Sequence, residues 1–125
     1  LKLKELSYVG AEPYSSADFL HGPVAIVERG YPVLAVAPSG MVFSNLWELL
    51  RHLKEEQHAE LLVISDRLQA LELADVPIHL PAGIPEWVSP LVAIVPAQLF
   101  SYHLTHIKGF DAEAPRGLKK VTISV

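Results

Sequence analysis

The chain has 125 residues, of which 50% are apolar and 19% are charged, and its formal net charge is −4. Such a chain fits one domain with a hydrophobic core, and its acidic balance argues against a nucleic-acid partner. Cysteine is absent, which excludes a disulfide framework and thiolate catalysis and favours a cytoplasmic location. The apolar runs are far shorter than the ~20 residues of a membrane helix, so no membrane partner is expected.

The N-terminal part predicts two short helices. The first ten residues have the pattern of the last turns of a helix that Gly10 closes. A second helix is predicted from Ser15 to Leu20, because Ser15 followed three residues later by Asp18 has the form of a capping box. A Gly-Pro pair then stops this helix. The pattern therefore places His21 at the end of the helix.

The middle of the chain predicts a parallel sheet. The apolar run from Pro32 to Ala37 is typical of a strand buried on both faces, and Ser39-Gly40 after it reads as a helix cap. An amphipathic helix is predicted over residues 42–55, and a second buried strand over 61–65. Residues 76–80 form a weaker third strand, because their proline cannot donate to a ladder.

One long apolar helix is predicted near the end. It starts at Pro85 or Pro90, runs to Lys108 and stops at Gly109. Pro96 should bend it.

The order of these elements predicts the fold class. Strand, helix, strand, short helix, strand and helix indicate an α/β protein with three αβα layers around a parallel sheet and right-handed crossovers. Three strands are fewer than the five or six that such a sheet usually has. The sequence also starts at Leu1, without methionine, in a pattern typical of a helix interior. We therefore expect a segment of a longer polypeptide whose remaining strands lie upstream.

Two sites near the N-terminus have side chains suited to proton transfer. Lys2 and Glu5 share a helix face, so they form either a surface ion pair or a general base with an ammonium beside it. His21 is either a packing residue or an acid/base group with a pKa near neutrality.

The C-terminal part offers a possible nucleophile. Its cations, Arg116, Lys119 and Lys120, are either a solubilising tail or the source of a lysine that forms a Schiff base. His103 and His106 are three residues apart, but no further ligand lies near them in sequence, so no metal site is expected.

Three segments together resemble the SIS (sugar isomerase) domain family, most of all the isomerase half of the glucosamine-6-phosphate synthases and the related deaminases. Residues 2–8 match the family motif Lys-Leu-Lys-Glu-x-Ser-Tyr, and His21 opens a His-Gly-Pro segment at the family's spacing after Glu5. The family ending Pro-Arg-Asn-Leu-Ala-Lys-Ser-Val-Thr is matched at Pro115, Arg116, Leu118 and Lys120. The resemblance runs from Leu1 to about Thr122.

This resemblance implies a SIS fold and roles for particular residues. Residues 1–109 would be the C-terminal part of a SIS subdomain in a protein with two such subdomains, and residues 110–125 a C-terminal tail. Glu5 would be the isomerisation base, assisted by Lys2. His21 would open the sugar ring from across a dimer interface, and Lys120 would be the Schiff-base lysine.

The implied function is that of an amino-sugar-phosphate isomerase, acting as deaminase or aminotransferase between fructose 6-phosphate and glucosamine 6-phosphate. A sugar phosphate and a second copy of the chain are the implied partners, and no metal or organic cofactor is implied. Gly117 replaces the family's asparagine, and Val121-Thr122 follow Lys120 directly where the synthases have a serine first. This ending looks more like that of stand-alone SIS proteins without a glutaminase. The alternative is a non-catalytic, sugar-phosphate-binding regulatory module, which has no need of a proton-transfer base such as Glu5.

Overall fold

The computed structural model describes residues 1–117, whose contacts divide them into two compact units. The larger unit is Pro13–Pro96, and the smaller one combines Leu1–Glu12 with the residues from Ala97 onward. The sheet lies in the larger unit.

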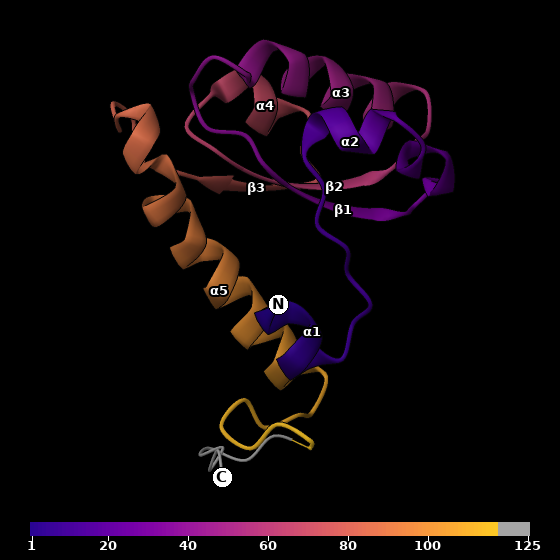
Figure 1. The fold of residues 1–125 in the computed structure, drawn as a ribbon, viewed down its shortest axis with the longest axis vertical. Coiled ribbons are helices and arrows are strands. Elements are labelled where there is room, and N and C mark those ends of the chain that lie inside the picture. Colours follow the sequence, from indigo (N-terminus) through magenta and orange to yellow (C-terminus); the bar gives the residue numbers. More distant parts are fainter. Residues whose placement is uncertain (118–125) are drawn as a thin grey trace, which may run out of the picture. The chain divides into compact units, whose positions relative to one another are not determined.

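The sheet has three parallel strands, as the sequence predicts. They are β1 (Pro32–Val36), β2 (Glu60–Ser65) and β3 (Val76–His79), in the spatial order β1-β2-β3 (Figure 1). The weakest of the predicted strands is therefore formed. Its proline, Pro77, lies opposite Val63 of β2.

Helices cover one face of this sheet. The elements α2 (Ser16–Leu20), α3 (Phe43–Glu55) and α4 (Leu68–Glu72) lie on the same side of the strands (Figure 1), and a short 3₁₀ helix, η1 (Pro23–Ile26), follows α2. This side holds the core. Its most deeply buried large side chains come from α3 and β2, namely Leu50, Leu53, Leu61 and Val63.

The first strand is not buried on both faces, so that prediction is wrong. Val33 and Ala35 pack in the core beneath the helices. Leu34 and Val36 point to the opposite face, where 37% and 43% of their surfaces stay exposed. The physical reason is that α2, α3 and α4 all lie on the other side of the strands (Figure 1), so they cannot cover these two side chains.

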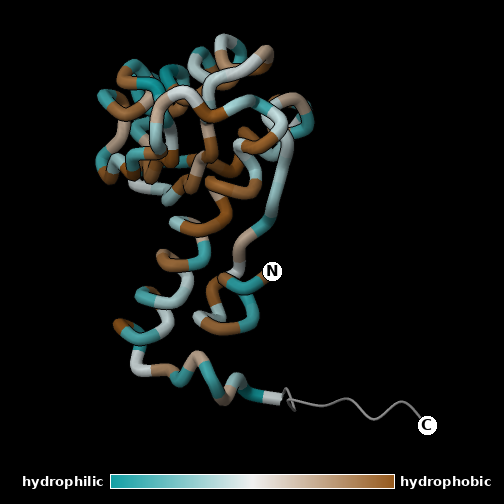
Figure 2. The backbone as a smooth tube through the Cα atoms, turned by 90° about the vertical axis from the view of Figure 1, so that its left-hand side faces the viewer, coloured by the Kyte–Doolittle hydropathy of each residue, from teal (hydrophilic) through white to brown (hydrophobic). Residues whose placement is uncertain are grey.

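The long C-terminal helix is confirmed as α5 (Ser89–Ile107), after the 3₁₀ helix η2 (Glu86–Val88). Pro96 lies inside α5, and the boundary between the two units follows this proline. The first half of α5 is strongly apolar, as the brown tube in Figure 2 shows.

The smaller unit consists of α1 (Lys2–Ser7), the second half of α5 and the turn that follows it. The predicted stop of α1 at Gly10 is wrong, because Tyr8 already takes a left-handed conformation with φ 55° and ends the helix. Gly109 ends α5 as predicted, with φ 76°. The next residue, Phe110, donates its N–H to the Thr105 carbonyl at 3.0 Å, which closes the helix end.

Candidate functional site

The proposed base and its helper meet on α1. Lys2 Nζ lies 3.1 Å from Glu5 Oε2, and the two side chains are 61% and 27% exposed. The spacing of three residues puts both on one face of the helix, as the sequence predicts. Glu5 is thus a partly buried carboxylate with an ammonium beside it. This arrangement suits a general base, and it equally suits a surface ion pair.

His21 lies in the other unit, directly after α2. The start of α2 is as predicted, because Ser15 Oγ accepts the Asp18 N–H at 3.1 Å and donates to the Asp18 carboxylate at 2.6 Å. His21 is exposed and donates its own N–H to the Asp18 carbonyl at 3.2 Å. The imidazole of His21 is therefore presented on the surface at a helix end.

The proposed Schiff-base lysine, Lys120, lies outside the described residues, as does Lys119. Of the tail cations, only Arg116 is described, and it packs on aromatic rings of its own unit. The geometry thus brings together Lys2 and Glu5 on α1, and His21 belongs to the other unit.

Hydrogen bonds between Ser39 and Asp66 join the loops that follow the carboxyl ends of β1 and β2. In parallel α/β sheets this edge commonly binds ligands. Here Asp66 accepts the Ser39 N–H at 2.7 Å and the Ser39 hydroxyl at 2.6 Å. Burial of Asp66 opposes ionisation, but the two bonds from Ser39 outweigh it and hold the pKa of Asp66 below its ordinary value.

The interpretation of Ser39-Gly40 as a helix cap is therefore wrong. The residue before α3 is Val42, whose apolar side chain cannot cap the helix, and the Ser39 hydroxyl donates to Asp66. Glu86 supplies a second carboxylate to this region by accepting the Met41 N–H at 2.9 Å. Two carboxylates here repel a phosphate, so this edge does not suit a phosphate group.

Another carboxylate, that of Asp75, links the start of β2 to α3 by hydrogen bonds. Asp75 receives a hydrogen bond from the Lys54 ammonium and another, at 2.8 Å, from the Leu61 N–H. These bonds, led by that from Lys54, lower the pKa of Asp75. The group joins strand and helix, and it gives no sign of a catalytic role.

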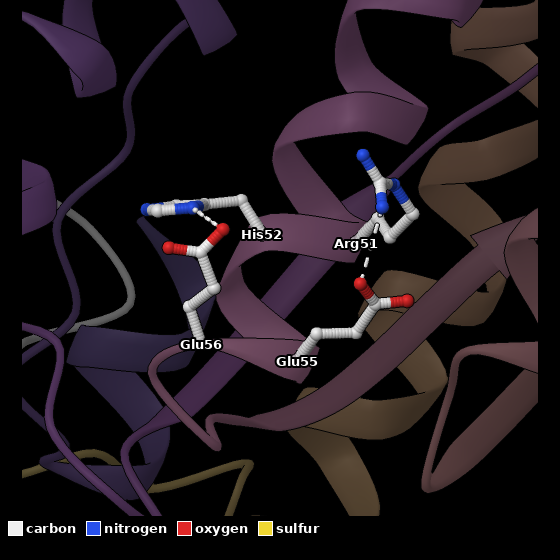
Figure 3. Close-up of polar contacts among 4 residues, drawn as sticks. All are labelled: Arg51, His52, Glu55 and Glu56. Atoms are coloured by element: carbon white, nitrogen blue, oxygen red, sulfur yellow. Dashed lines mark hydrogen bonds and ion pairs between the residues drawn. The ribbon is translucent and has the colours of Figure 1, made fainter.

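The exposed face of α3 carries two polar side-chain pairs between successive turns (Figure 3). Arg51 lies 3.2 Å from Glu55, and His52 Nδ1 lies 3.1 Å from Glu56. Such exposed pairs at a spacing of four residues contribute little stability. The Arg51–Glu55 pair, of similar length, is a matched control for the Lys2–Glu5 pair.

Two features are absent from residues 1–117. No group of three or more histidine, aspartate or glutamate side chains there is arranged to hold a metal ion. The ring of Tyr102 packs on His106 at 4.4 Å and on His103 at 5.5 Å. In the same part of the chain, every helix is too short or too polar to cross a membrane.

Sequence reasoning missed one cluster in the smaller unit. Tyr8, Phe110 and Arg116 pack together, although the sequence assigned Tyr8 to a motif and Arg116 to a tail without linking them. The available signal was Phe110, an aromatic residue directly after the glycine that ends α5.

The fold and these sites define an α/β protein with a parallel sheet and a candidate proton-transfer pair. The family model of the SIS domain matches residues 1–108. The chain therefore belongs to the SIS domain family.

The relatives are consistent with this assignment. The chain is 41% identical to glutamine–fructose-6-phosphate aminotransferase (isomerizing) of Thermococcus kodakarensis and 39% identical to that of Pyrococcus horikoshii, and each match covers 98% of this chain. The chain spans about a fifth of the length of these curated relatives, 20% in both.

A solved structure supports the same fold. The C-terminal domain of glucosamine-fructose-6-phosphate aminotransferase from Francisella tularensis superposes with a TM-score of 0.76 and 34% sequence identity. The match covers 89% of this chain and 31% of that one. The predicted SIS fold, with helices layered on a parallel sheet, is thereby confirmed.

Proposed function

We propose that this chain is the C-terminal part of an amino-sugar-phosphate isomerase that interconverts fructose 6-phosphate and glucosamine 6-phosphate as an aminotransferase or a deaminase. The observation that carries the proposal is the Lys2–Glu5 pair, at 3.1 Å on α1, in a chain whose relatives are named as isomerizing aminotransferases. Residues 1–109 would belong to a SIS subdomain, and 110–125 would be its catalytic tail.

Glu5 moves a proton between adjacent sugar carbons in this proposal. Its carboxylate takes the proton from one carbon and returns it to the next, and the Lys2 ammonium stabilises the anion between turnovers. Isomerisation of this kind needs a base held against the carbon chain of the sugar. The partial burial of Glu5, at 27% exposure, supports this role because it keeps some water away.

His21 and Lys120 supply the steps before proton transfer. His21, exposed at the end of α2, opens the sugar ring by moving a proton between ring and carbonyl oxygens. The neutral amine of Lys120 condenses with the keto carbonyl and releases water, and hydrolysis later restores the free amine. A second copy of the chain would contribute His21 to the site.

The test replaces Glu5 by glutamine in the complete natural polypeptide. Glu5→Gln keeps size and hydrogen bonding but removes the base, so turnover should fall by about 10²–10⁴-fold while affinity for the sugar phosphate changes little. Lys120→Ala should abolish borohydride trapping of the keto sugar, because no amine remains to form the imine. The matched control is Glu55→Gln, which breaks an ion pair of similar length on α3.

The regulatory module remains the second candidate function. It is favoured if the natural polypeptide binds the sugar phosphate without isomerising, deaminating or trapping it. Identical behaviour of Glu5→Gln and the wild type in these assays would replace the enzymatic proposal by this one.

A further inference from the structure

The helix α1, which carries the proposed base, is short. It has six residues, Lys2–Ser7, and a helix of this length is not stable in water without tertiary contacts. The Lys2–Glu5 pair lies entirely within α1, so it cannot fix the position of α1 in its unit. The direction of the Glu5 carboxylate therefore depends on the contacts that α1 makes with the rest of the chain.

Lys108, directly after α5, makes such a contact with the end of α1. Its ammonium donates to the carbonyl of Ser7 at 2.6 Å, although the two residues are 101 positions apart in the sequence. Ser7 is the last residue of α1 and is fully buried. A carbonyl in the last turn of a helix has no partner within the helix, and a buried carbonyl without a hydrogen bond costs free energy. The Lys108 ammonium supplies that bond, and its positive charge suits a helix C-terminus.

The turn after α5 holds Lys108 in place. The Lys108 N–H donates to the Leu104 carbonyl at 3.0 Å, which continues the bonding pattern of α5 by one residue. Lys108 Nζ also lies 5.6 Å from the ring centroid of Phe110, a cation–π distance. Phe110 in turn meets the Tyr8 ring edge to face, with the centroids 4.8 Å apart. Two residues of this turn are thus in contact with the two successive residues, Ser7 and Tyr8, that end α1.

We propose that Lys108 is a positioning residue, which holds α1 so that the carboxylate of Glu5 keeps its place against the sugar. Ser7 follows Glu5 by two residues and lies about 3 Å farther along the helix axis, so a displacement at Ser7 is passed on to Glu5. A displacement of about 1 Å at a reacting group can lower a rate by about 100-fold. Lys108 acts through Glu5 and touches no substrate. This inference rests on the proposed function, and it adds a residue to which that function assigns no part.

The test measures how fast glucosamine 6-phosphate takes up carbon-bound deuterium from heavy water on the complete natural polypeptide. This sugar already carries its amino group, so the assay needs no amino donor and reports proton transfer alone. Lys108→Met removes the ammonium but keeps an unbranched apolar side chain beside Phe110. It should lower kcat for this uptake by about 10- to 100-fold and change KM little. Lys108→Arg, which retains a cationic donor, should restore most of the rate.

A double-mutant cycle with Glu5→Gln shows whether Lys108 acts through the base. Once the base is removed its position no longer matters, so Lys108→Met should slow deuterium uptake by less than about twofold in the Glu5→Gln background. An equal fold-loss in both backgrounds, or a raised KM with unchanged kcat, would overturn the positioning role. The matched control is Lys54→Met, because Lys54 also donates to a residue distant in sequence, Asp75, but in the other unit. Lys54→Met should leave uptake unchanged.

Amide hydrogen exchange separates positioning from loss of folding. The Tyr8 N–H donates to the Lys4 carbonyl at 3.2 Å, so its exchange rate reports whether α1 stays closed. In Lys108→Met this amide should exchange at least about fivefold faster, while the thermal midpoint of the polypeptide stays near that of the wild type. Unchanged exchange at Tyr8 would refute the anchoring of α1 by Lys108 and leave the proposed function intact. If the wild type puts no deuterium into the sugar phosphate, the proposed function itself fails, and the Tyr8 amide still decides whether Lys108 holds α1.

Discussion

Gly40 offers a quantitative test of the loop at the carboxyl end of β1. A Cβ added at Gly40 would lie 2.5 Å from Glu86 Cδ, 2.9 Å from Cγ and closer still to Oε1. The Glu86 side chain is flexible and can move away, but it then loses the Met41 N–H, which it accepts at 2.9 Å. Gly40→Ala should therefore break one hydrogen bond and leave the fold intact.

The magnitude follows from two opposing effects. Loss of a solvent-exposed hydrogen bond to a carboxylate costs about 1 kcal/mol. Gly40 does not have a positive φ, so alanine also gains about 0.4–1 kcal/mol by restricting the unfolded chain. In the wild-type background, Gly40→Ala should then lower the free energy of unfolding by between zero and about 0.6 kcal/mol. With Glu86→Ala already present, Gly40→Ala should instead stabilise by about 0.4–1 kcal/mol.

The assay is a double-mutant cycle by equilibrium unfolding, together with hydrogen exchange at the Met41 amide. The coupling energy should be about 1 kcal/mol, and Met41 should exchange about fivefold faster in Gly40→Ala. Gly10→Ala is the matched control, because an added Cβ there meets nothing within 4 Å. Equal effects of Gly40→Ala in the two backgrounds would refute the contact between Glu86 and this loop.

Two further predictions concern acid stability and assembly. The pKa of Asp66 is lowered from an ordinary 3.8, so its stabilising effect is complete above that pH and is lost as pH falls through the lower value in the folded state. The stability difference between wild type and Asp66→Asn, measured by denaturant titration, should therefore shrink below about pH 4, and a difference independent of pH would contradict this. Secondly, because His21 is proposed to act across a dimer interface, mixing inactive Glu5→Gln and His21→Ala dimers should restore part of the activity. No recovery in subunits shown to exchange would argue against a shared site.

The sequence predicted the elements well because its local patterns were strong. The amphipathic pattern of α3 leaves one apolar face to be buried, and the apolar run of β2 belongs inside the core. Both elements form as expected. Burial on both faces of β1 was predicted wrongly, because α2, α3 and α4 all cover the same face of the sheet, and an apolar run cannot say whether helices cover one face of its strand or both. Leu34 and Val36 stay exposed for that reason.

The candidate site was less predictable, because its contacts join residues far apart in the chain. Lys2 and Glu5 meet as their spacing requires. No periodicity links Tyr8 to Arg116, whose contact depends on the turn after α5. Ser39 was predicted to cap a helix, but its hydroxyl donates to Asp66, the residue directly after β2. The roles of Glu5, His21, Lys2 and Lys120 stay predictions.

Because of Pro77 in β3, the two edges of the sheet differ in how well a further strand can pair with them. The Leu80 N–H donates toward β2, to the Ser65 carbonyl at 2.8 Å. Successive N–H groups of a strand point to alternate sides, so the nitrogen of Pro77 faces outward, where it cannot donate. In β1 the Ala37 N–H donates toward β2, to the Ile64 carbonyl at 2.9 Å, so by the same alternation the N–H groups of Leu34 and Val36 face the outer edge. An additional strand can therefore pair regularly along β1, while the proline hinders chance edge-to-edge association at β3.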